Sequence, residues 1–211
     1  MKDAPPTVHV IDDDQSVREA LYGLLETAAL QVELFSSPQQ YLEREPKTRP
    51  NCIILDVRLP RSSGLDFQKA LADAGVHTPI IFLTGYADIP MTVQAMKAGA
   101  VEFLTKPYRD QALLEAVLLA IDKDLARRQS DSALAETLQR FELLTARERQ
   151  VMALTVAGQQ NKQIAGQLGV RDVTVRLHRR QLMQKMQAKS VADLTRIAHI
   201  LRGGGVDISA F

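Results

Sequence analysis

The stretch Cys52-Ile-Ile-Leu-Asp-Val-Arg-Leu-Pro-Arg-Ser-Ser-Gly64 decides the fold that the sequence predicts. It opens with an apolar run of strand length, which ends abruptly at Asp56. Pro60 and Gly64 follow, and both residue types interrupt regular structure. The pattern predicts a buried strand that delivers one carboxylate to its carboxyl end, where ligands bind in open α/β sheets. A single Asp in this position is more often a helix cap or turn residue, so its meaning depends on its neighbours.

The composition is that of an ordinary globular chain: 211 residues, 45% hydrophobic and 24% charged. That length fits one large domain or two small ones. No apolar run approaches the ~20 residues that span a bilayer, and the first residues lack the apolar segment of a signal peptide. The single cysteine, Cys52, is expected to be a small core residue. We therefore expect a cytoplasmic protein without a membrane partner.

Charge is distributed unevenly along the chain. Residues 1–126 hold 18 acidic and 12 basic residues, whereas residues 127–211 hold 7 acidic and 14 basic residues. This asymmetry suggests two units with different partners, and the basic unit is a candidate for binding nucleic acid. Basic faces are often only solvated, so charge alone is weak evidence.

Short apolar runs alternate with amphipathic helical patterns through the first half of the chain. The expected strands are residues 7–11, 32–35, 52–55, 79–83 and 100–104. Alternation of this kind predicts a parallel sheet that is covered on both faces and joined by right-handed crossovers. The strands are mainly apolar rather than regularly alternating with polar residues, which agrees with burial on both faces.

Polar residues follow four of these strands: Asp12 and Asp13, then Asp56, Thr84 and Lys106. Crowded carboxylates resist ionisation unless a cation compensates, and oxygen ligands suit Mg²⁺. Lysine could pair with a carboxylate or with an incoming anion, and threonine offers a hydroxyl. Together these groups provide what phosphoryl transfer to an aspartate requires. Separate caps and surface charges are the alternative, which the joint placement at four strand ends disfavours.

These residues also resemble a known family. The motifs, which span about residues 7–125, are Ile11-Asp-Asp-Asp14, Leu55-Asp-Val-Arg-Leu-Pro60 with Ser63-Gly64, Thr84-Gly85 and Lys106-Pro107. They are similar to those of the receiver domain of bacterial response regulators. The resemblance implies a flavodoxin-like (βα)5 fold with a five-stranded parallel sheet. It also implies that Asp56 accepts phosphate from a sensor histidine kinase. The implied Mg²⁺ ligands are Asp12, Asp13, Asp56 and the backbone carbonyl of Arg58.

The same resemblance assigns a switching role to three further residues. Lys106 would hold a phosphate oxygen, Thr84 would turn toward the phosphate, and Phe103 would follow it. Otherwise, Phe103 is a plain core aromatic. Asp14 is expected to cap the first helix instead of binding metal.

Residues 84–100 resemble FixJ-type regulators more specifically. In that group, the face around this helix and the last strand is a phosphorylation-dependent dimer surface, which implies a homodimer when phosphorylated. The alternative for Val93 and Met96 is packing against the sheet. The segment that follows the last receiver helix contains no Gly or Pro up to Phe141, which predicts a helical or partly flexible connector.

The second half predicts a helix-turn-helix. Thr145 and Glu148 have the spacing of a capping box, and the helix that they start stops at Gly158. Asn161 is expected to cap a helix over residues 162–168, and Gly169 permits the turn into a third helix over about residues 172–187. A fourth helix starts at Ser190. The glycine-rich end from residue 203 is expected to be disordered.

Helical periodicity predicts which face of the third helix points outward. The inward stripe is Val175, His178, Leu182 and Met186. Arg176 and Arg180 lie one turn apart on the opposite face, where arginine can bind guanine bidentately in the major groove. Arg179 lies on the flank, where it suits a phosphate contact. Solvation is the alternative for exposed arginines, but a helix-turn-helix in a basic unit favours double-stranded DNA.

The second half resembles the LuxR-type DNA-binding domain. The motifs are Leu144-Thr-x-Arg-Glu148, Gly158, Asn161-Lys-x-Ile-Ala165 and Thr174-Val-x-x-His178. The resemblance implies backbone-positioning contacts from Asn161, Lys162, Thr174 and His178, and base contacts from Arg176, Leu177 and Arg180. One departure is Arg171-Asp172, which stands where the family usually has a Ser-centred cap. Asp172 can serve as the cap instead.

The sequence therefore predicts a phosphorylation-switched transcription factor rather than an enzyme. The expected domains are a receiver (1–124), a helical linker (125–141), a DNA-binding domain (142–202) and a disordered tail (203–211). Expected partners are a sensor histidine kinase, promoter DNA, a second copy of the chain and RNA polymerase. One alternative is an aspartate-based phosphotransferase or phosphatase. Another is a regulator that ignores phosphate and uses its receiver only to dimerise.

Overall fold

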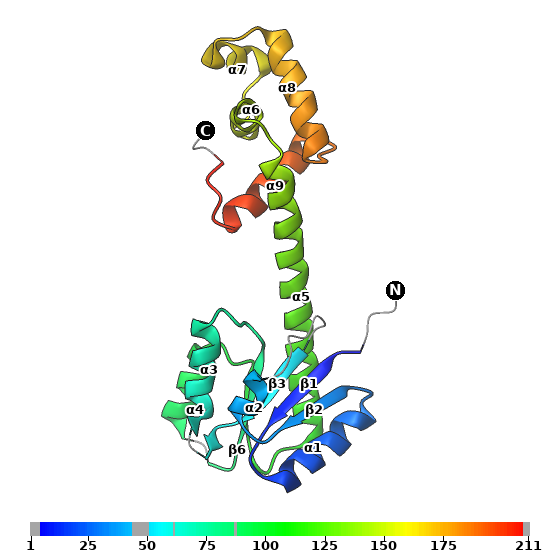
Figure 1. Ribbon diagram of the computed structural model, residues 1–211, viewed down its shortest axis with the longest axis vertical. Helices are drawn as coiled ribbons and strands as arrows, with labels where there is room; N and C mark the ends of the chain where they lie inside the picture. Colours follow the sequence, from blue (N-terminus) through cyan, green and yellow to red (C-terminus); the bar gives the residue numbers. More distant parts are fainter. Residues whose placement is uncertain (1–4, 44–50, 61, 87, 209–211) are drawn as a thin grey trace. The chain divides into compact units, whose positions relative to one another are not determined.

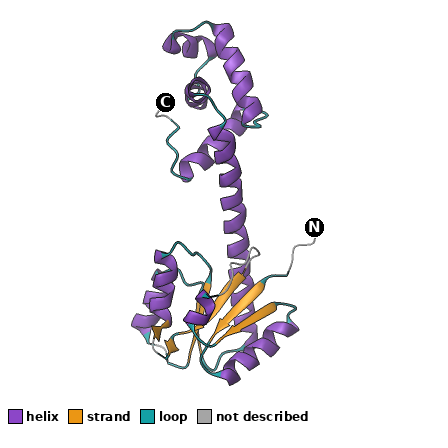
Figure 2. Ribbon diagram, in the orientation of Figure 1, coloured by secondary structure: helices purple, strands orange, loops and turns teal. Residues whose placement is uncertain are grey.

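The computed structural model describes residues 5–43, 51–60, 62–86 and 88–208. The chain divides into two compact units, Met1–Arg128 and Gln129–Phe211, called unit 1 and unit 2. Unit 1 is an α/β unit and unit 2 is helical (Figures 1 and 2).

Unit 1 is built on a parallel five-stranded sheet in the order β2-β1-β3-β6-β7. Its strands are β1 (Thr7–Ile11), β2 (Gln31–Phe35), β3 (Asn51–Asp56), β6 (Ile80–Thr84) and β7 (Glu102–Thr105). The helices of this unit are α1 (Gln15–Thr27), α2 (Pro38–Leu42), α3 (Gly64–Asp73), α4 (Ile89–Lys97) and the first part of α5 (Asp110–Glu142). The predicted flavodoxin-like fold is therefore confirmed. A short antiparallel pair, β4 (Arg58–Leu59) and β5 (Ser62–Ser63), was not predicted.

Two apolar clusters cover the two faces of the sheet. Val8, Val10 and Cys52 face a cluster that includes residues of α1 and α5. Ile11 and Ile53 face the other cluster, which includes residues of α2, α3 and α4. Strands that bury both faces have no need to alternate apolar and polar residues. Burial, with a smaller effect from Asp124, raises the pKa of the Cys52 thiol to about 12, as suits a protonated core side chain.

The helix α5 runs without interruption from Asp110 to Glu142. It therefore includes the whole segment, residues 125–141, that was expected to be a linker. This segment contains no Gly or Pro and is rich in Ala, Leu, Arg, Gln and Glu, which favour helix.

Unit 2 consists of the end of α5 and of α6 (Ala146–Val156), α7 (Asn161–Leu168), α8 (Asp172–Lys185) and α9 (Val191–Gly203). Val175 and Leu182 of α8, and Met186 at its C-cap, are fully buried in the core, which confirms that they face inward. His178, the fourth residue of the predicted inward stripe, is half-buried. The capping box of Thr145 and Glu148 is present. Gly169 takes a left-handed conformation, with φ of 65°, at the turn between α7 and α8.

Three local predictions for unit 2 are corrected. Gln160 occupies the cap position of α7, one residue before Asn161. Arg171 occupies the cap position of α8 without a side-chain cap bond, and Asp172 is the first residue of the helix. The prediction of disorder from residue 203 is wrong for residues 203–208, because Gly203 belongs to α9 and Ile208 is buried in the core of unit 2.

Candidate functional site

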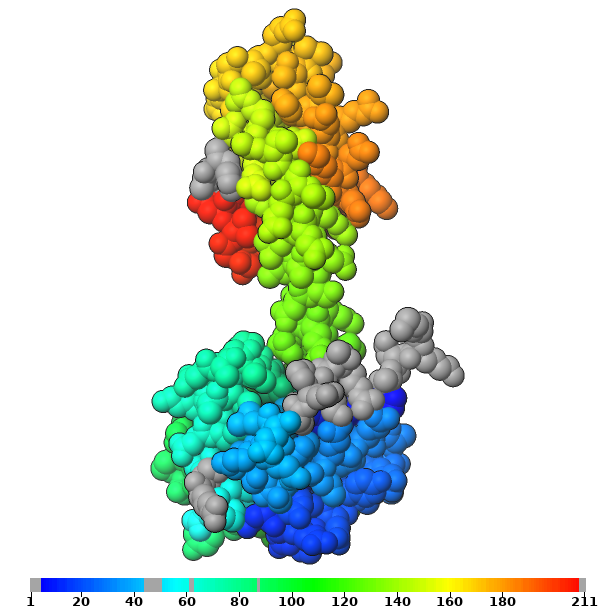
Figure 3. Space-filling view, viewed as in Figure 1, coloured from blue at the N-terminus to red at the C-terminus, as the bar shows by residue number. Residues whose placement is uncertain are grey.

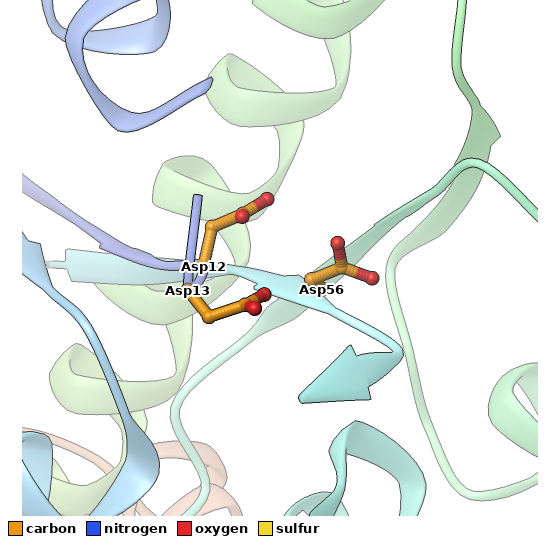
Figure 4. A group of neighbouring side chains, drawn as sticks. All are labelled: Asp12, Asp13 and Asp56. Carbon is orange, nitrogen blue, oxygen red and sulfur yellow. The ribbon is translucent and has the colours of Figure 1, made fainter. Parts of the chain in front are cut away.

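The ends of β1 and β3 bring three carboxylates together. Ile11 pairs with Leu55 across the two strands, so the residues that follow them, Asp12 and Asp56, lie side by side at the carboxyl ends of β1 and β3. One oxygen from each of Asp12, Asp13 and Asp56 lies within 4.8 Å of the others. Figure 4 shows the three side chains beside one another at the ends of these strands. The sequence-based prediction that these acids share one edge of the sheet matches this geometry.

Lys106 links two of the carboxylates. Its Nζ donates hydrogen bonds to Asp12 Oδ2 at 2.7 Å and to Asp56 Oδ2 at 3.0 Å. Burial raises the pKa of Asp12, and the hydrogen bond from Lys106 offsets only part of this effect. Burial disfavours the charged form of Lys106, but its hydrogen bonds to Asp12 and Asp56 outweigh burial and raise its pKa.

The cluster can accept a further cation. Three carboxylates exceed the single ammonium of Lys106 in charge, and the available ligand atoms are all oxygens. Such a set fits a hard divalent ion better than a soft one. The same residues line an open hollow of about 420 Å³, which has room for a phosphoryl group. Asp14 is the N-cap residue of α1, as predicted, and its side chain accepts a hydrogen bond from Ser16 N at 2.8 Å.

The loop after β3 holds Asp56 in place through its backbone. The Arg58 N–H donates to Asp56 Oδ1 at 2.9 Å. The Gly64 N–H donates to Val57 O at 2.8 Å. A β-carbon at Gly64 would lie 2.4 Å from Asp56 O, so only glycine fits there without a shift. The sequence showed Gly64 as a turn residue but gave no sign of this close approach.

The side chain of Arg58 covers one side of the hollow. Its guanidinium carbon lies 4.3 Å from the centroid of the Tyr86 ring, in cation–π geometry. Tyr86 is otherwise 68% exposed. Sequence reasoning missed this pair, because the residues lie on different loops and no local pattern connects them.

Thr84 and Phe103, the predicted switch residues, lie on neighbouring strands. Thr84 is buried, and its Oγ1 donates to Tyr86 O at 3.1 Å and accepts from Tyr86 N at 3.2 Å. Its hydroxyl is therefore bonded to the β6–α4 loop and not to Asp56. The Phe103 ring is partly buried, and its centroid lies 5.9 Å from that of Phe82.

The helix α4 presents apolar side chains to solvent. Ile89 is 82% exposed, Val93 44% and Met96 41%. Packing against the sheet does not account for these three side chains, since Ala95 is the α4 residue that is fully buried.

The outward face of α8 carries charged and apolar side chains. The Arg176 side chain is 69% exposed, Val173 is 61% exposed and Leu177 is 54% exposed. Arg180 is exposed as well. Figure 3 shows the orange segment that includes the end of α8 at the surface of unit 2. The prediction that this stripe faces outward matches the structure.

The predicted backbone-contacting residues occupy different environments. Lys162 is exposed, whereas Thr174 and His178 are half-buried. Arg179 and Asn161 contact each other: Arg179 Nη1 donates to Asn161 Oδ1 at 2.8 Å and so joins α8 to the start of α7. The separate roles that sequence reasoning gave these two residues did not anticipate this bond.

An acidic, lysine-bridged sheet edge in one unit and a basic helix-turn-helix in the other together define a regulator that receives a chemical signal and binds DNA. Comparison with known proteins specifies the class further. A model of the response regulator receiver domain matches residues 8–118, and a model of the bacterial regulatory proteins of the luxR family matches residues 142–198. The chain belongs to the two-component response regulators that join these two domains. It is a phosphorylation-dependent transcriptional regulator of the FixJ/NarL type.

Similar proteins cover nearly the whole chain. It is 46% identical to nodulation protein W of Bradyrhizobium diazoefficiens, over 92% of this chain and 86% of that protein. It is 38% identical to the transcriptional regulatory protein FixJ of Rhizobium meliloti, over 94% of this chain and 96% of that protein. The solved structure of response regulator StyR is 45% identical, with a TM-score of 0.83, and the match covers 93% of this chain and 99% of that one. Within the part of the chain that the structure describes, no helix is both long enough and apolar enough to cross a membrane.

Proposed function

We propose that Asp56 accepts a phosphoryl group from a sensor histidine kinase and that this event controls promoter binding. The observation that carries the proposal is Lys106, whose ammonium bonds Asp56 and Asp12 at once, within a cluster of three carboxylates. We assign the receiver function to residues 1–124 and the DNA-binding function to residues 142–202.

The cluster is suited to Mg²⁺, held by Asp12, Asp13, Asp56 and the backbone carbonyl of Arg58. When bound, the ion would neutralise charge on the incoming phosphoryl group. The side chains of Asp56 and Lys106 carry out the transfer. The Asp56 carboxylate attacks phosphorus, a P–O bond forms, and the bond from phosphorus to the donor breaks. Lys106 is within reach to exchange its hydrogen bond to Asp56 for one to a phosphate oxygen.

The phosphate would be sensed by Thr84. Its hydroxyl now bonds the backbone of Tyr86, and turning toward a phosphate oxygen would release the β6–α4 loop. Phe103 packs beside β6 against Phe82 and would adjust to the vacated space. The position of α4 and of its exposed apolar side chains would then change, so that phosphorylation of Asp56 would alter the structure of this surface.

We propose that this surface forms the homodimer of the phosphorylated protein. A two-fold dimer presents two copies of α8 to a two-fold related DNA site. Arg176, Leu177 and Arg180 would face bases. Asn161, Lys162, Thr174, His178 and Arg179 would position the DNA backbone, and the bound dimer would act on RNA polymerase.

The test is formation of an acyl phosphate. The full-length chain is incubated with Mg²⁺ and acetyl phosphate, and the phosphorylated species is quantified by intact mass and by its lability to hydroxylamine. Asp56→Asn should abolish the adduct, whereas Asp73→Asn, an exposed acid on α3, should leave it unchanged. An adduct that persists in Asp56→Asn would place the phosphoacceptor elsewhere.

A second measurement addresses the consequence of phosphorylation. Sedimentation and DNA-binding isotherms are compared with and without acetyl phosphate. Tighter dimerisation and tighter promoter binding are expected only with the phosphodonor and only when Asp56 is intact. Equal binding in both conditions would instead favour a regulator that ignores phosphate. Continued turnover of a small phosphate ester would favour an enzyme.

A further inference from the structure

An ion pair joins the first and second turns of α8 on the face assigned to DNA. Arg176 Nη2 lies 2.7 Å from Asp172 Oδ2, one helical turn away. The Arg176 side chain is 69% exposed and that of Asp172 is 31% exposed. Within the described residues, Asp172 Oδ1 is buried and accepts no hydrogen bond. The carboxylate is therefore fixed at the edge of the exposed face, with Arg176 as its polar partner.

Two ordinary explanations for Asp172 are weak. It does not cap α8, since Arg171 occupies the cap position. An acid in the first turn interacts favourably with the helix dipole, and an exposed ion pair adds little stability, so both effects are small. Against them stands a cost specific to this surface, because a carboxylate beside bound DNA repels the phosphates. To offset this repulsion, Asp172 would have to benefit DNA binding in another way.

The benefit follows from the geometry of arginine. A free guanidinium on a long side chain samples many rotamers and can bind phosphate or base equally. A guanidinium whose Nη2 forms an ion pair with a carboxylate still has N–H groups left for the bidentate contact with guanine. Restriction before binding lowers the entropy lost on binding. The negative charge also makes the surroundings of Arg176 less favourable for a phosphate.

We propose that Asp172 is a specificity-determining residue, which holds Arg176 in the orientation that reads a guanine in the major groove. It acts through Arg176 and is a positioning residue. This inference rests on the proposed DNA-contacting role of α8. According to this inference, Arg176 is already oriented before DNA binds, and the negative charge of Asp172 lowers the affinity for non-specific DNA.

The test uses the full-length chain with Mg²⁺ and acetyl phosphate. A duplex is first selected by the wild-type protein from a randomised pool, and affinities are then measured for single-base variants of that duplex and for an unrelated duplex. Arg176→Ala should remove about tenfold or more of the preference for guanine at one position of each half-site. Asp172→Ala should reduce the preference at that same position by about three- to tenfold. It should also leave or raise affinity for the unrelated duplex, since one negative charge is removed.

The double variant supplies the decisive comparison. If Asp172 acts through Arg176, then Asp172→Ala in the Arg176→Ala background should change the preference at that position by less than about twofold. Glu136→Ala is the matched control. Glu136 forms an ion pair of the same i,i+4 spacing with Arg140 on α5, and its loss changes net charge equally. It should leave the base preference unchanged.

Three results would overturn the inference. Asp172→Ala could weaken all sequences alike, it could alter preference at a position that Arg176 does not affect, or its effect could add fully to that of Arg176→Ala. If wild-type protein and Arg176→Ala behave as expected and Asp172→Ala does not, only the positioning role fails. If the wild-type protein selects no sequence, the proposed function fails and this inference fails with it. Melting curves of each variant identify losses that arise from unfolding.

Discussion

Asp124 connects α5 to the start of β3, the strand that carries Asp56. Its carboxylate is fully buried. It accepts hydrogen bonds from Asn51 N at 2.8 Å, Arg127 Nη2 at 2.6 Å and Arg128 Nε at 2.8 Å. Asp124→Ala removes all three bonds at once. The expected consequence is a weaker anchor for the first residues of β3.

The expected loss can be worked from these contacts. The Asn51 N–H belongs to a residue that is 2% exposed, so losing this acceptor costs about 1–3 kcal/mol. The Arg127 and Arg128 side chains are 35% and 27% exposed. Water can replace much of what they lose, so their share is discounted to about 1 kcal/mol together. We expect Asp124→Ala to destabilise unit 1 by about 2–4 kcal/mol, which is a roughly 30- to 700-fold change in an opening equilibrium.

The single cysteine of the chain reports this opening directly. Cys52 is the residue after Asn51 and is fully buried, so a thiol reagent reaches it only when the start of β3 opens. Labelling of Asp124→Ala under native conditions should be faster than that of wild type by the factor above. Asp122→Ala, which removes an exposed acid from the same helix, is the control and should change the rate less than about threefold. A labelling rate for Asp124→Ala within threefold of wild type would refute the anchoring role.

Three further outcomes are expected. Gly64→Ala should destabilise unit 1 by about 1–3 kcal/mol in thermal unfolding and slow acyl phosphate formation, because the added carbon meets the carbonyl of Asp56 at 2.4 Å. Burial acts to raise the pKa of Glu148, but hydrogen bonds from Lys185 and Thr145 outweigh it and hold that pKa below its usual range. The stability that this carboxylate adds is therefore present above its unfolded-state pKa and is lost as pH falls through the folded one. Unfolding of unit 2 measured against pH should show this acid loss in wild type and much less of it in Glu148→Gln. Val93→Asp should abolish phosphorylation-dependent dimerisation in sedimentation, and unchanged dimers would exclude the α4 face.

The position of the acidic cluster could be predicted because one rule governs it. Parallel strands end at the same edge of a sheet, so apolar runs that stop at Asp12, Asp56 and Lys106 necessarily bring these residues near one another. The register of β1 on β3 then completes the arrangement. The prediction required only that the strands be recognised, and their mainly apolar runs of four or five residues indicate strands clearly.

The Asp124 network could not be predicted in the same way. Its partner Asn51 lies 73 positions away, and an acid among basic residues on a helix is ordinarily solvated. Its burial is decided by how α5 packs on the sheet, and local pattern does not contain this information. The same limit applies to Arg58 and Tyr86, whose contact depends on two loop conformations. The caps of α7 and α8 were misplaced by one residue for a smaller reason, since several neighbouring polar residues can each start a helix.

The pairing of α8 side chains shows what periodicity leaves undetermined about recognition. Periodicity correctly placed Arg176 on the exposed face and Arg179 on the flank, but it treated both as free cations. In the structure, Arg176 forms an ion pair with Asp172, and Arg179 donates a hydrogen bond to Asn161. A paired arginine reaches DNA either by keeping its partner, which fixes its direction, or by giving the partner up, which costs affinity. The Arg179–Asn161 bond joins α7 to α8, so keeping it preserves the angle between the two helices that a helix-turn-helix needs in the groove. If α8 contacts DNA as proposed, specificity in this unit depends on the partners of its arginines as much as on the arginines themselves.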